Sequence, residues 1–113
     1  MKEIKALIHP TKLSPVLEAL HRIPDMPGVT VSTVEGYGRS QEPAKQNSVN
    51  GSCYTSVEMS KIETVVPNSL EKTVVDTIVN ASKTGRVGDG KIFVYNVSNV
   101  IKIRTGEKGE TAI

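Results

Sequence analysis

The segment TGRVGDGKIF, from Thr84 to Phe93, contains the residues best suited to chemistry. Gly85 and the pair Gly90-Lys91 have the G-x-x-x-x-G-K spacing of a phosphate-binding P-loop. A P-loop also needs a Ser or Thr directly after its lysine, to hold magnesium, and a helix whose N-terminus faces the phosphates. Ile92 occupies the hydroxyl position, and the run IFVYNV is typical of a strand. The segment is therefore not an ATP-hydrolysing P-loop.

The same segment can still bind an anion. Its glycines at 85, 88 and 90 allow backbone N–H groups to converge on one point and form an anion nest. Arg86 and Lys91 add positive charge beside that point. A plain helix-to-strand turn, in which glycine supplies positive φ and Lys91 is merely solvated, explains the spacing at least as well. Spacing alone leaves both interpretations open.

Composition limits the class of protein. The 113 residues are enough for one domain, with the 37% hydrophobic and 23% charged content of an ordinary globular chain. A net charge of +2, 4% aromatic residues and no Lys/Arg run argue against a nucleic-acid partner. The single cysteine, Cys53, excludes an internal disulfide and a cysteine-based zinc cluster. Without a signal peptide or an apolar run near ~20 residues, we expect a cytoplasmic protein that does not insert into a membrane.

Hydrophobic patterning predicts a strand and a helix in the first part of the chain. Residues 2–9 alternate between apolar and polar, which predicts a half-buried strand. Ser14 and Pro15 are typical of the N-cap and first position of a helix. Residues 29–34 are rich in β-branched side chains and predict a second strand, which we expect to close at Gly36-Tyr37-Gly38.

The second part of the chain repeats this order. Residues 62–66 predict a strand, and Asn68 and Glu71 have the spacing of a capping box at the start of a second helix. Residues 92–97 predict the last strand. The polar segment 40–60 shows no clean period, and strong elements bracket it, so we expect a flexible loop that binds a partner.

Strand, helix, strand, strand, helix, strand is the order of the ferredoxin-like βαββαβ fold. This α+β fold has one antiparallel sheet with two helices on one face, and it accounts for residues 1–113 as a single domain. The other sheet face needs cover. In the strand from Lys61 to Val66, Ile62, Val65 and Val66 are all apolar, which indicates burial on both sides. We therefore expect an oligomer.

Several segments of the chain resemble the PII signal-transduction family. They are VTVSTVEGYGR, TGRVGDGKIFV and IKIRTGEKGETAI, together with KIETVVP and the N-terminal MKEIKALIHP. The similarity covers nearly the whole chain, and TG-x-x-GDGKIF and I-x-IRTGE are specific in combination. The resemblance implies a homotrimer that binds adenine nucleotides (ATP or ADP, with AMP as a further candidate) in the clefts between its subunits.

The resemblance also implies roles for individual residues. The phosphates would meet the loop 84–91 and basic residues of the C-terminal loop 102–113. Lys102 stands where the family usually has arginine. The positive charge is kept, but the planar guanidinium, which can hold an anion with two N–H groups at once, is lost. Other matched positions would close over the nucleotide or line its base and ribose. The implied nucleotide-binding residues are Ile8, Thr30, Gly36, Tyr37, Gly38, Arg39, Val65, Gly88, Asp89, Gly90, Lys91, Lys102 and Arg104.

Segment 40–60 matches the T-loop of the family in position and length but departs from its sequence. Ser40 replaces a glutamine that helps to hold magnesium and 2-oxoglutarate, and Met59 replaces the lysine that pairs with the 2-oxoglutarate carboxylate. These replacements argue against binding of magnesium and 2-oxoglutarate. Ser52 stands at the tyrosine that the family uridylylates. Ser52, Cys53 and Tyr54 are the candidates for partner contact or modification.

The resulting hypothesis is a non-catalytic regulator, in nitrogen regulation, that controls a membrane transporter or a metabolic enzyme through its long loop. A first alternative is a PII-like regulator redirected to metal-ion or bicarbonate transport. A second is a small phosphate-handling enzyme, for which Thr84 and Asp89 are the only catalytic candidates. A third is a metal-sensing trimer of the CutA kind, which one cysteine and the separate His9 and His21 support poorly, so we predict no metal site.

Overall fold

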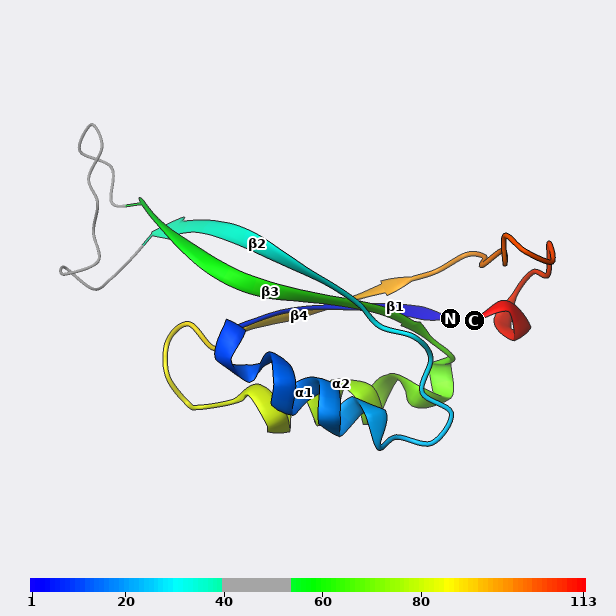
Figure 1. The fold of residues 1–113 in the computed structure, drawn as a ribbon, viewed down its shortest axis with the longest axis horizontal. Coiled ribbons are helices and arrows are strands. Elements are labelled where there is room, and N and C mark those ends of the chain that lie inside the picture. Colours follow the sequence, from blue (N-terminus) through cyan, green and yellow to red (C-terminus); the bar gives the residue numbers. More distant parts are fainter. Residues whose placement is uncertain (40–53) are drawn as a thin grey trace.

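The computed structural model describes residues 1–39 and 54–113, which form one sheet and two helices (Figure 1). The elements follow the predicted ferredoxin-like order, with a short 3-10 turn before each helix (Pro10–Lys12 and Asn68–Leu70) and another at Glu110–Ala112. None of the described helices is long and apolar enough to cross a membrane. The strands and helices are β1 (Lys2–Ile8), α1 (Leu13–His21), β2 (Thr30–Arg39), β3 (Tyr54–Val66), α2 (Glu71–Ser82) and β4 (Gly90–Asn96).

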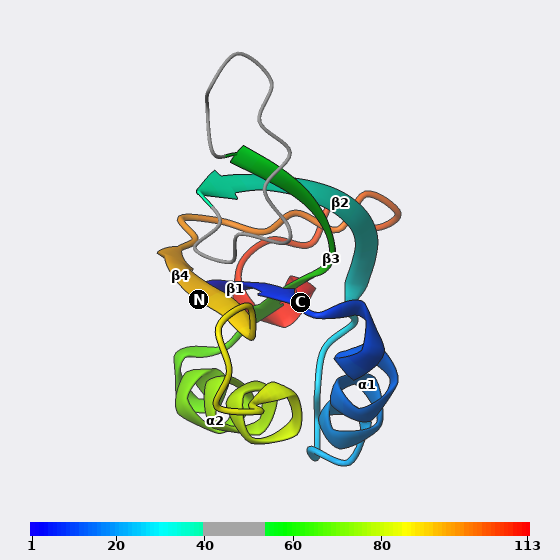
Figure 2. The same ribbon diagram turned by 90° about the vertical axis from the view of Figure 1, so that its left-hand side faces the viewer.

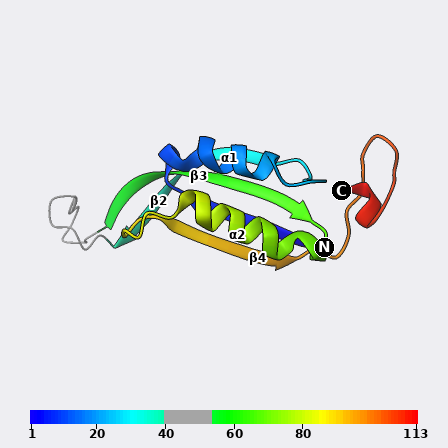
Figure 3. The same ribbon diagram turned by 90° about the horizontal axis from the view of Figure 1, so that it is seen from below.

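The four strands form an antiparallel sheet in the order β2-β3-β1-β4. The middle of β1 sets the register, because Ala6 pairs with Ile62 of β3 and with Ile92 of β4. Both helices lie side by side on one face of the sheet, and the other face is left without helices (Figures 2 and 3). The predicted fold class is confirmed.

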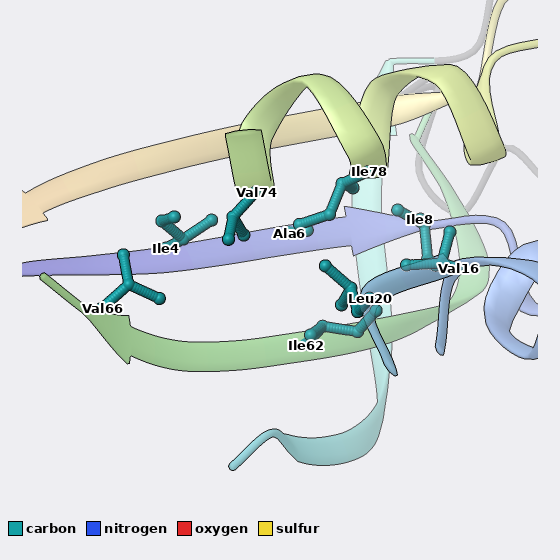
Figure 4. Close-up of a cluster of buried hydrophobic side chains, with 9 residues drawn as sticks. All are labelled: Ile4, Ala6, Ile8, Val16, Leu20, Ile62, Val66, Val74 and Ile78. Carbon is teal, nitrogen blue, oxygen red and sulfur yellow. The ribbon is translucent and has the colours of Figure 1, made fainter. Parts of the chain in front are cut away.

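The core lies between the helices and the sheet (Figure 4). Alternate residues of β1 point into it, which is why that strand alternates in sequence. Full burial of each large aliphatic side chain contributes about 1.5–3 kcal/mol to folding. The cluster consists of Ile4, Ala6, Ile8, Val16, Leu20, Ile62, Val66, Val74 and Ile78.

Both predicted helix caps are wrong, because a 3-10 turn precedes each helix. Helix α1 begins at Leu13 with Lys12 at the N-cap, so Ser14 is already inside its first turn. The ring of His9 caps the preceding 3-10 turn instead, since its Nδ1 accepts a hydrogen bond of 3.3 Å from the N–H of Thr11. Helix α2 begins at Glu71 with no side-chain cap, so the capping box with Asn68 does not form.

Strands β2 and β3 are longer than their sequences indicate. Strand β2 runs through Gly36 and Gly38 instead of closing there, and β3 begins at Tyr54 instead of Ile62. Strand β1 ends at Ile8, opposite Ser60, so residues 35–39 and 54–58 pair only with each other as a two-stranded ribbon. Backbone pairing holds this ribbon together, and its described side chains, those of residues 35–38 and 56–58, are not buried, so the sequence shows no apolar period there. Residues 54–60 of the predicted loop 40–60 are thus strand.

Candidate nucleotide-binding site

The loop between α2 and β4 contains the glycines that the sequence marks. Gly85, Gly88 and Gly90 all have positive φ, of 83°, 97° and 109°. A Cβ at Gly90 would lie 1.8 Å from the carbonyl oxygen of Leu7 in the neighbouring strand, so only glycine fits there. Strand β4 begins at Gly90, and no helix follows the loop. The geometry confirms that this is not an ATP-hydrolysing P-loop.

Asp89 is committed to holding the loop together. Its carboxylate accepts hydrogen bonds from the N–H groups of Thr84 (2.8 Å) and Gly85 (2.9 Å), and from the hydroxyl of Thr84. These bonds, that of the Thr84 hydroxyl above all, hold the pKa of Asp89 below its ordinary value. The hydroxyl of Thr84 in turn accepts a bond of 3.2 Å from the N–H of Arg86. Asp89 therefore positions the loop, while the first three N–H groups of the loop are already used.

A cavity of about 240 Å³ lies beside this loop, between α2 and the start of β4. Val75, Val79 and Ile92 give it an apolar wall, and Asp89 and Gly90 form its rim. Ile8 also lines it, although the Ile8 side chain is buried in the core. The loop residues and Ile8 thus meet at one end of the sheet, where Ile8 pairs directly with Gly90.

The other implied base and ribose residues lie elsewhere. Thr30 and Val65 line a second cavity of about 350 Å³, together with Glu3, Glu63 and the C-terminal Ile113. Val65 pairs with Glu3, five residues from Ile8 along β1, which corresponds to about 17 Å at ~3.4 Å per residue.

The basic residues of the C-terminal loop also lie far from the glycine loop. Lys102 and Arg104 belong to a hairpin-like turn closed by the bridge between Ile101 and Lys108. The glycine loop (yellow) and the C-terminal segment (red) are at opposite ends of the chain's fold in Figures 1 and 3. The implied residues therefore form two groups within one chain, one around Gly88–Lys91 and the other around Thr30, Val65 and the C-terminal loop.

Residues 36–39, in the ribbon of β2 and β3, belong to the group around Gly88–Lys91. Gly36 and Gly38 lie beyond the row of Ile8, at the sheet end that carries the glycine loop. Tyr37 is 70% exposed, and its hydroxyl donates a bond of 2.9 Å to Glu35. Arg39 is the last residue of β2 and pairs with Tyr54. Of the loop candidates, Ser52 and Cys53 lie outside the described residues.

Two contributors were missed in the sequence. Thr84 was predicted only as a catalytic candidate. Its N–H donates to the Asp89 carboxylate five residues later, a spacing at which an aspartate can close a short loop. Glu107, within the quoted IRTGE motif, forms an ion pair with Lys102, with 3.7 Å between Nζ and Oε1. Among the described residues, no group of three or more His, Cys, Asp or Glu side chains is arranged to hold a metal ion.

Comparison with known proteins identifies the family of the chain. The model of the family described as "Nitrogen regulatory protein P-II" matches residues 1–107. "Nitrogen regulatory protein P-II 1" of Escherichia coli (strain K12) is 43% identical over 113 residues, the full length of both chains. "Nitrogen regulatory protein P-II" of Rhodospirillum rubrum is 42% identical over the same full length. A crystal structure of Arabidopsis thaliana PII bound to citrate matches with a TM-score of 0.80 at 38% identity, covering 99% of this chain and 91% of that one.

The fold and the full-length matches define a signal-transduction protein of the ferredoxin-like class. The chain belongs to the nitrogen regulatory P-II family. Members of this family are regulators without catalytic activity, so the chain is not an enzyme and the phosphate-handling alternative is set aside. This agrees with Asp89, one of the two catalytic candidates, being occupied by hydrogen bonds within its own loop.

Proposed function

We propose that this protein binds ATP or ADP in clefts between the subunits of a homotrimer and controls a transporter or an enzyme through its long loop. The observation that carries the proposal is the separation of the implied binding residues into two groups at opposite ends of one chain. A second copy that brings its C-terminal loop beside the glycine loop of the first would complete one site. In a closed ring, every chain would give one group to each neighbouring cleft.

The helix-free sheet face gives such an assembly a surface to bury. Phe93 and Tyr95 of the edge strand β4 are 40% and 45% exposed there, and Val57 of β3 is 46% exposed. The ammonium of Lys5 lies 5.1 Å from the centre of the Tyr95 ring, so the face also contains charge. Large apolar side chains left on one face of a sheet support burial against another copy.

The two groups differ in chemistry in a way that suits a nucleotide. The second half of the glycine loop can direct N–H groups at a phosphate, and Lys91 is exposed beside it. Lys102 and Arg104 would add positive charge from the second chain. Thr30 and Val65 offer a hydroxyl and an apolar surface at the second cavity, as a ribose and a base require.

Regulation would follow from the place where the long loop begins. The ribbon of residues 35–39 and 54–58 extends from the sheet end that carries the glycine loop. A nucleotide bound there changes the loop only if its affinity differs between conformations of the loop. Nitrogen regulation is the process that the family name indicates.

One observation favours the alternative of a regulator redirected to metal-ion or bicarbonate transport. Met59, at the position of the family's carboxylate-binding lysine, lies in β3 opposite Val34 and is half-buried. A thioether in this apolar setting cannot pair with a carboxylate, so 2-oxoglutarate loses one of its expected contacts. The Arabidopsis relative was crystallised bound to citrate, another small carboxylate. A small organic carboxylate, 2-oxoglutarate, is therefore included in the binding experiment below.

Isothermal titration calorimetry with ATP, ADP and AMP tests the proposal, each with and without 2-oxoglutarate or bicarbonate. We expect ATP and ADP to bind, and the solution mass to be that of a trimer. A monomeric mass, or no heat with any nucleotide, would overturn the proposal. An effect of bicarbonate but not of 2-oxoglutarate on nucleotide affinity would favour the redirected regulator.

A further inference from the structure

The C-terminal turn that carries Lys102 also fixes a carboxylate beside it. The N–H of Lys102 donates to the carbonyl of Glu107, and the N–H of Gly106 donates to the carbonyl of Lys102, both at 2.8 Å. A third bond, of 2.9 Å from Gly109 to Val100, closes the base of the turn. Gly106, with φ of 72°, allows the reversal. The backbone therefore holds residues 102 and 107 as neighbours whatever their side chains do.

The side chains use this proximity. The Lys102 ammonium lies 3.7 Å from a carboxylate oxygen of Glu107, and the two side chains are 39% and 40% exposed. A phosphate that approaches Lys102 therefore meets an ammonium that is already paired. It must displace the carboxylate, or share the ammonium with it at a distance where two anions repel each other.

Because residue 102 is a lysine, a phosphate and the Glu107 carboxylate compete for the same ammonium. An ammonium is a compact point charge, whereas the flat guanidinium of arginine can hold one anion on each of two edges. We propose that Glu107 is a built-in competitor for Lys102, which weakens nucleotide binding and penalises ATP more than ADP because ATP carries more negative charge. This inference rests on the proposed function, because it needs phosphates at Lys102.

The test compares Glu107→Gln with the matched control Glu110→Gln, which removes the same charge three residues further along the chain. Gln has nearly the shape of Glu, and three backbone bonds hold the turn without the carboxylate. We expect Glu107→Gln to bind ATP roughly two- to fivefold tighter than the wild type, with a smaller gain for ADP. Glu110→Gln should change both affinities by less.

A double-mutant cycle tests whether Glu107 changes nucleotide affinity through Lys102. In a Lys102→Met background, Glu107→Gln should gain no more affinity than Glu110→Gln does, because the ammonium that is competed for is absent. Unchanged trimer mass and melting temperature control for folding.

Weaker ATP binding by Glu107→Gln would overturn the inference and make Glu107 a positioning residue. Equal gains for Glu107→Gln and Glu110→Gln would overturn it in favour of net charge alone. Both results leave the proposed function standing, whereas absence of nucleotide binding by the wild type overturns the two together.

Discussion

At the scale of single residues, the glycine loop is specified by steric fit and by one carboxylate. Gly90 is required twice, once for its φ of 109° and once because Leu7 leaves no room for a Cβ. The Asp89 carboxylate accepts the hydrogen bonds that set the path of the chain before it. Lys91 is left exposed at the loop's end, where it can act on a ligand.

Replacing Gly90 by alanine should destabilise the protein strongly. The new Cβ would lie 1.8 Å from the Leu7 carbonyl oxygen, so β1 and β4 must shift apart, and positive φ adds its own strain. We expect a loss of at least about 2 kcal/mol in the free energy of unfolding, measured by urea denaturation. Gly88→Ala is the matched control: its φ is 97°, but no atom lies within 4 Å of the new Cβ. It should cost about 1 kcal/mol. Equal losses would show that the close approach to Leu7 is unimportant.

At the scale of elements, the stability of the loop comes from side-chain bonds and that of the ribbon from backbone bonds. The loop 84–89 has no ladder of its own, so the Asp89 carboxylate takes the place of one. The ribbon of β2 and β3 continues past the end of β1 by pairing alone. The loop and the ribbon therefore both extend past the packed part of the sheet, and hydrogen bonds hold them there.

Acidification should release the loop while the carboxylate is being protonated. The pKa of Asp89 in the folded chain lies below the ordinary value of 3.8, chiefly because Thr84 donates to the ionised form. This stabilisation is complete above about pH 3.8 and is lost as the pH falls through the lower folded pKa. NMR should show the amide signals of Thr84 and Gly85 titrating together at that lower pH. Asp89→Asn should abolish the titration, and a midpoint at or above the ordinary value would contradict the assignment.

At the scale of the whole molecule, the proposed nucleotide site needs residues from two chains. Strand register separates Ile8 from Val65, and the glycine loop and the C-terminal loop lie at opposite ends (Figure 1). Under the proposed function, the glycine loop of one chain and the basic C-terminal turn of a second chain would meet at one nucleotide. Assembly would thus be a condition for ligand binding as well as a means of covering the open sheet face.

Mixing two defective chains should restore binding if the site lies between subunits. Lys91→Ala and Arg104→Ala should each weaken ATP binding about ten- to hundredfold in homotrimers while leaving the trimer intact, since each removes a charged contact to phosphate. In a trimer of both variants, one cleft combines Lys91 from one chain with Arg104 from the other. Calorimetry on co-expressed chains should therefore recover a tight-binding fraction. No recovery in verified mixed trimers would place the whole site within one chain.

The sequence by itself determined the order of the elements and the identity of the glycine loop. Alternation in β1 and the apolar stripe of α2, with Val74 and Ile78 on one face, are local consequences of burial and can be read without coordinates. The rejection of the ATP-hydrolysing P-loop was equally local, because Ile92 and the strand after it are adjacent in sequence to the motif.

Only the tertiary structure decided the helix starts, the reach of β2 and β3, and the partners of the charged residues. The 3-10 turns displaced both predicted caps, and the ribbon contains no apolar period because its described side chains, those of residues 35–38 and 56–58, are not buried. Asp89 and Lys102 were both among the nucleotide-binding residues that the family resemblance implied, yet each is paired within its own turn. Such pairings depend on where the backbone folds back on itself. Residue type tells which side chains can bind an anion, and chain geometry decides which of them are already occupied.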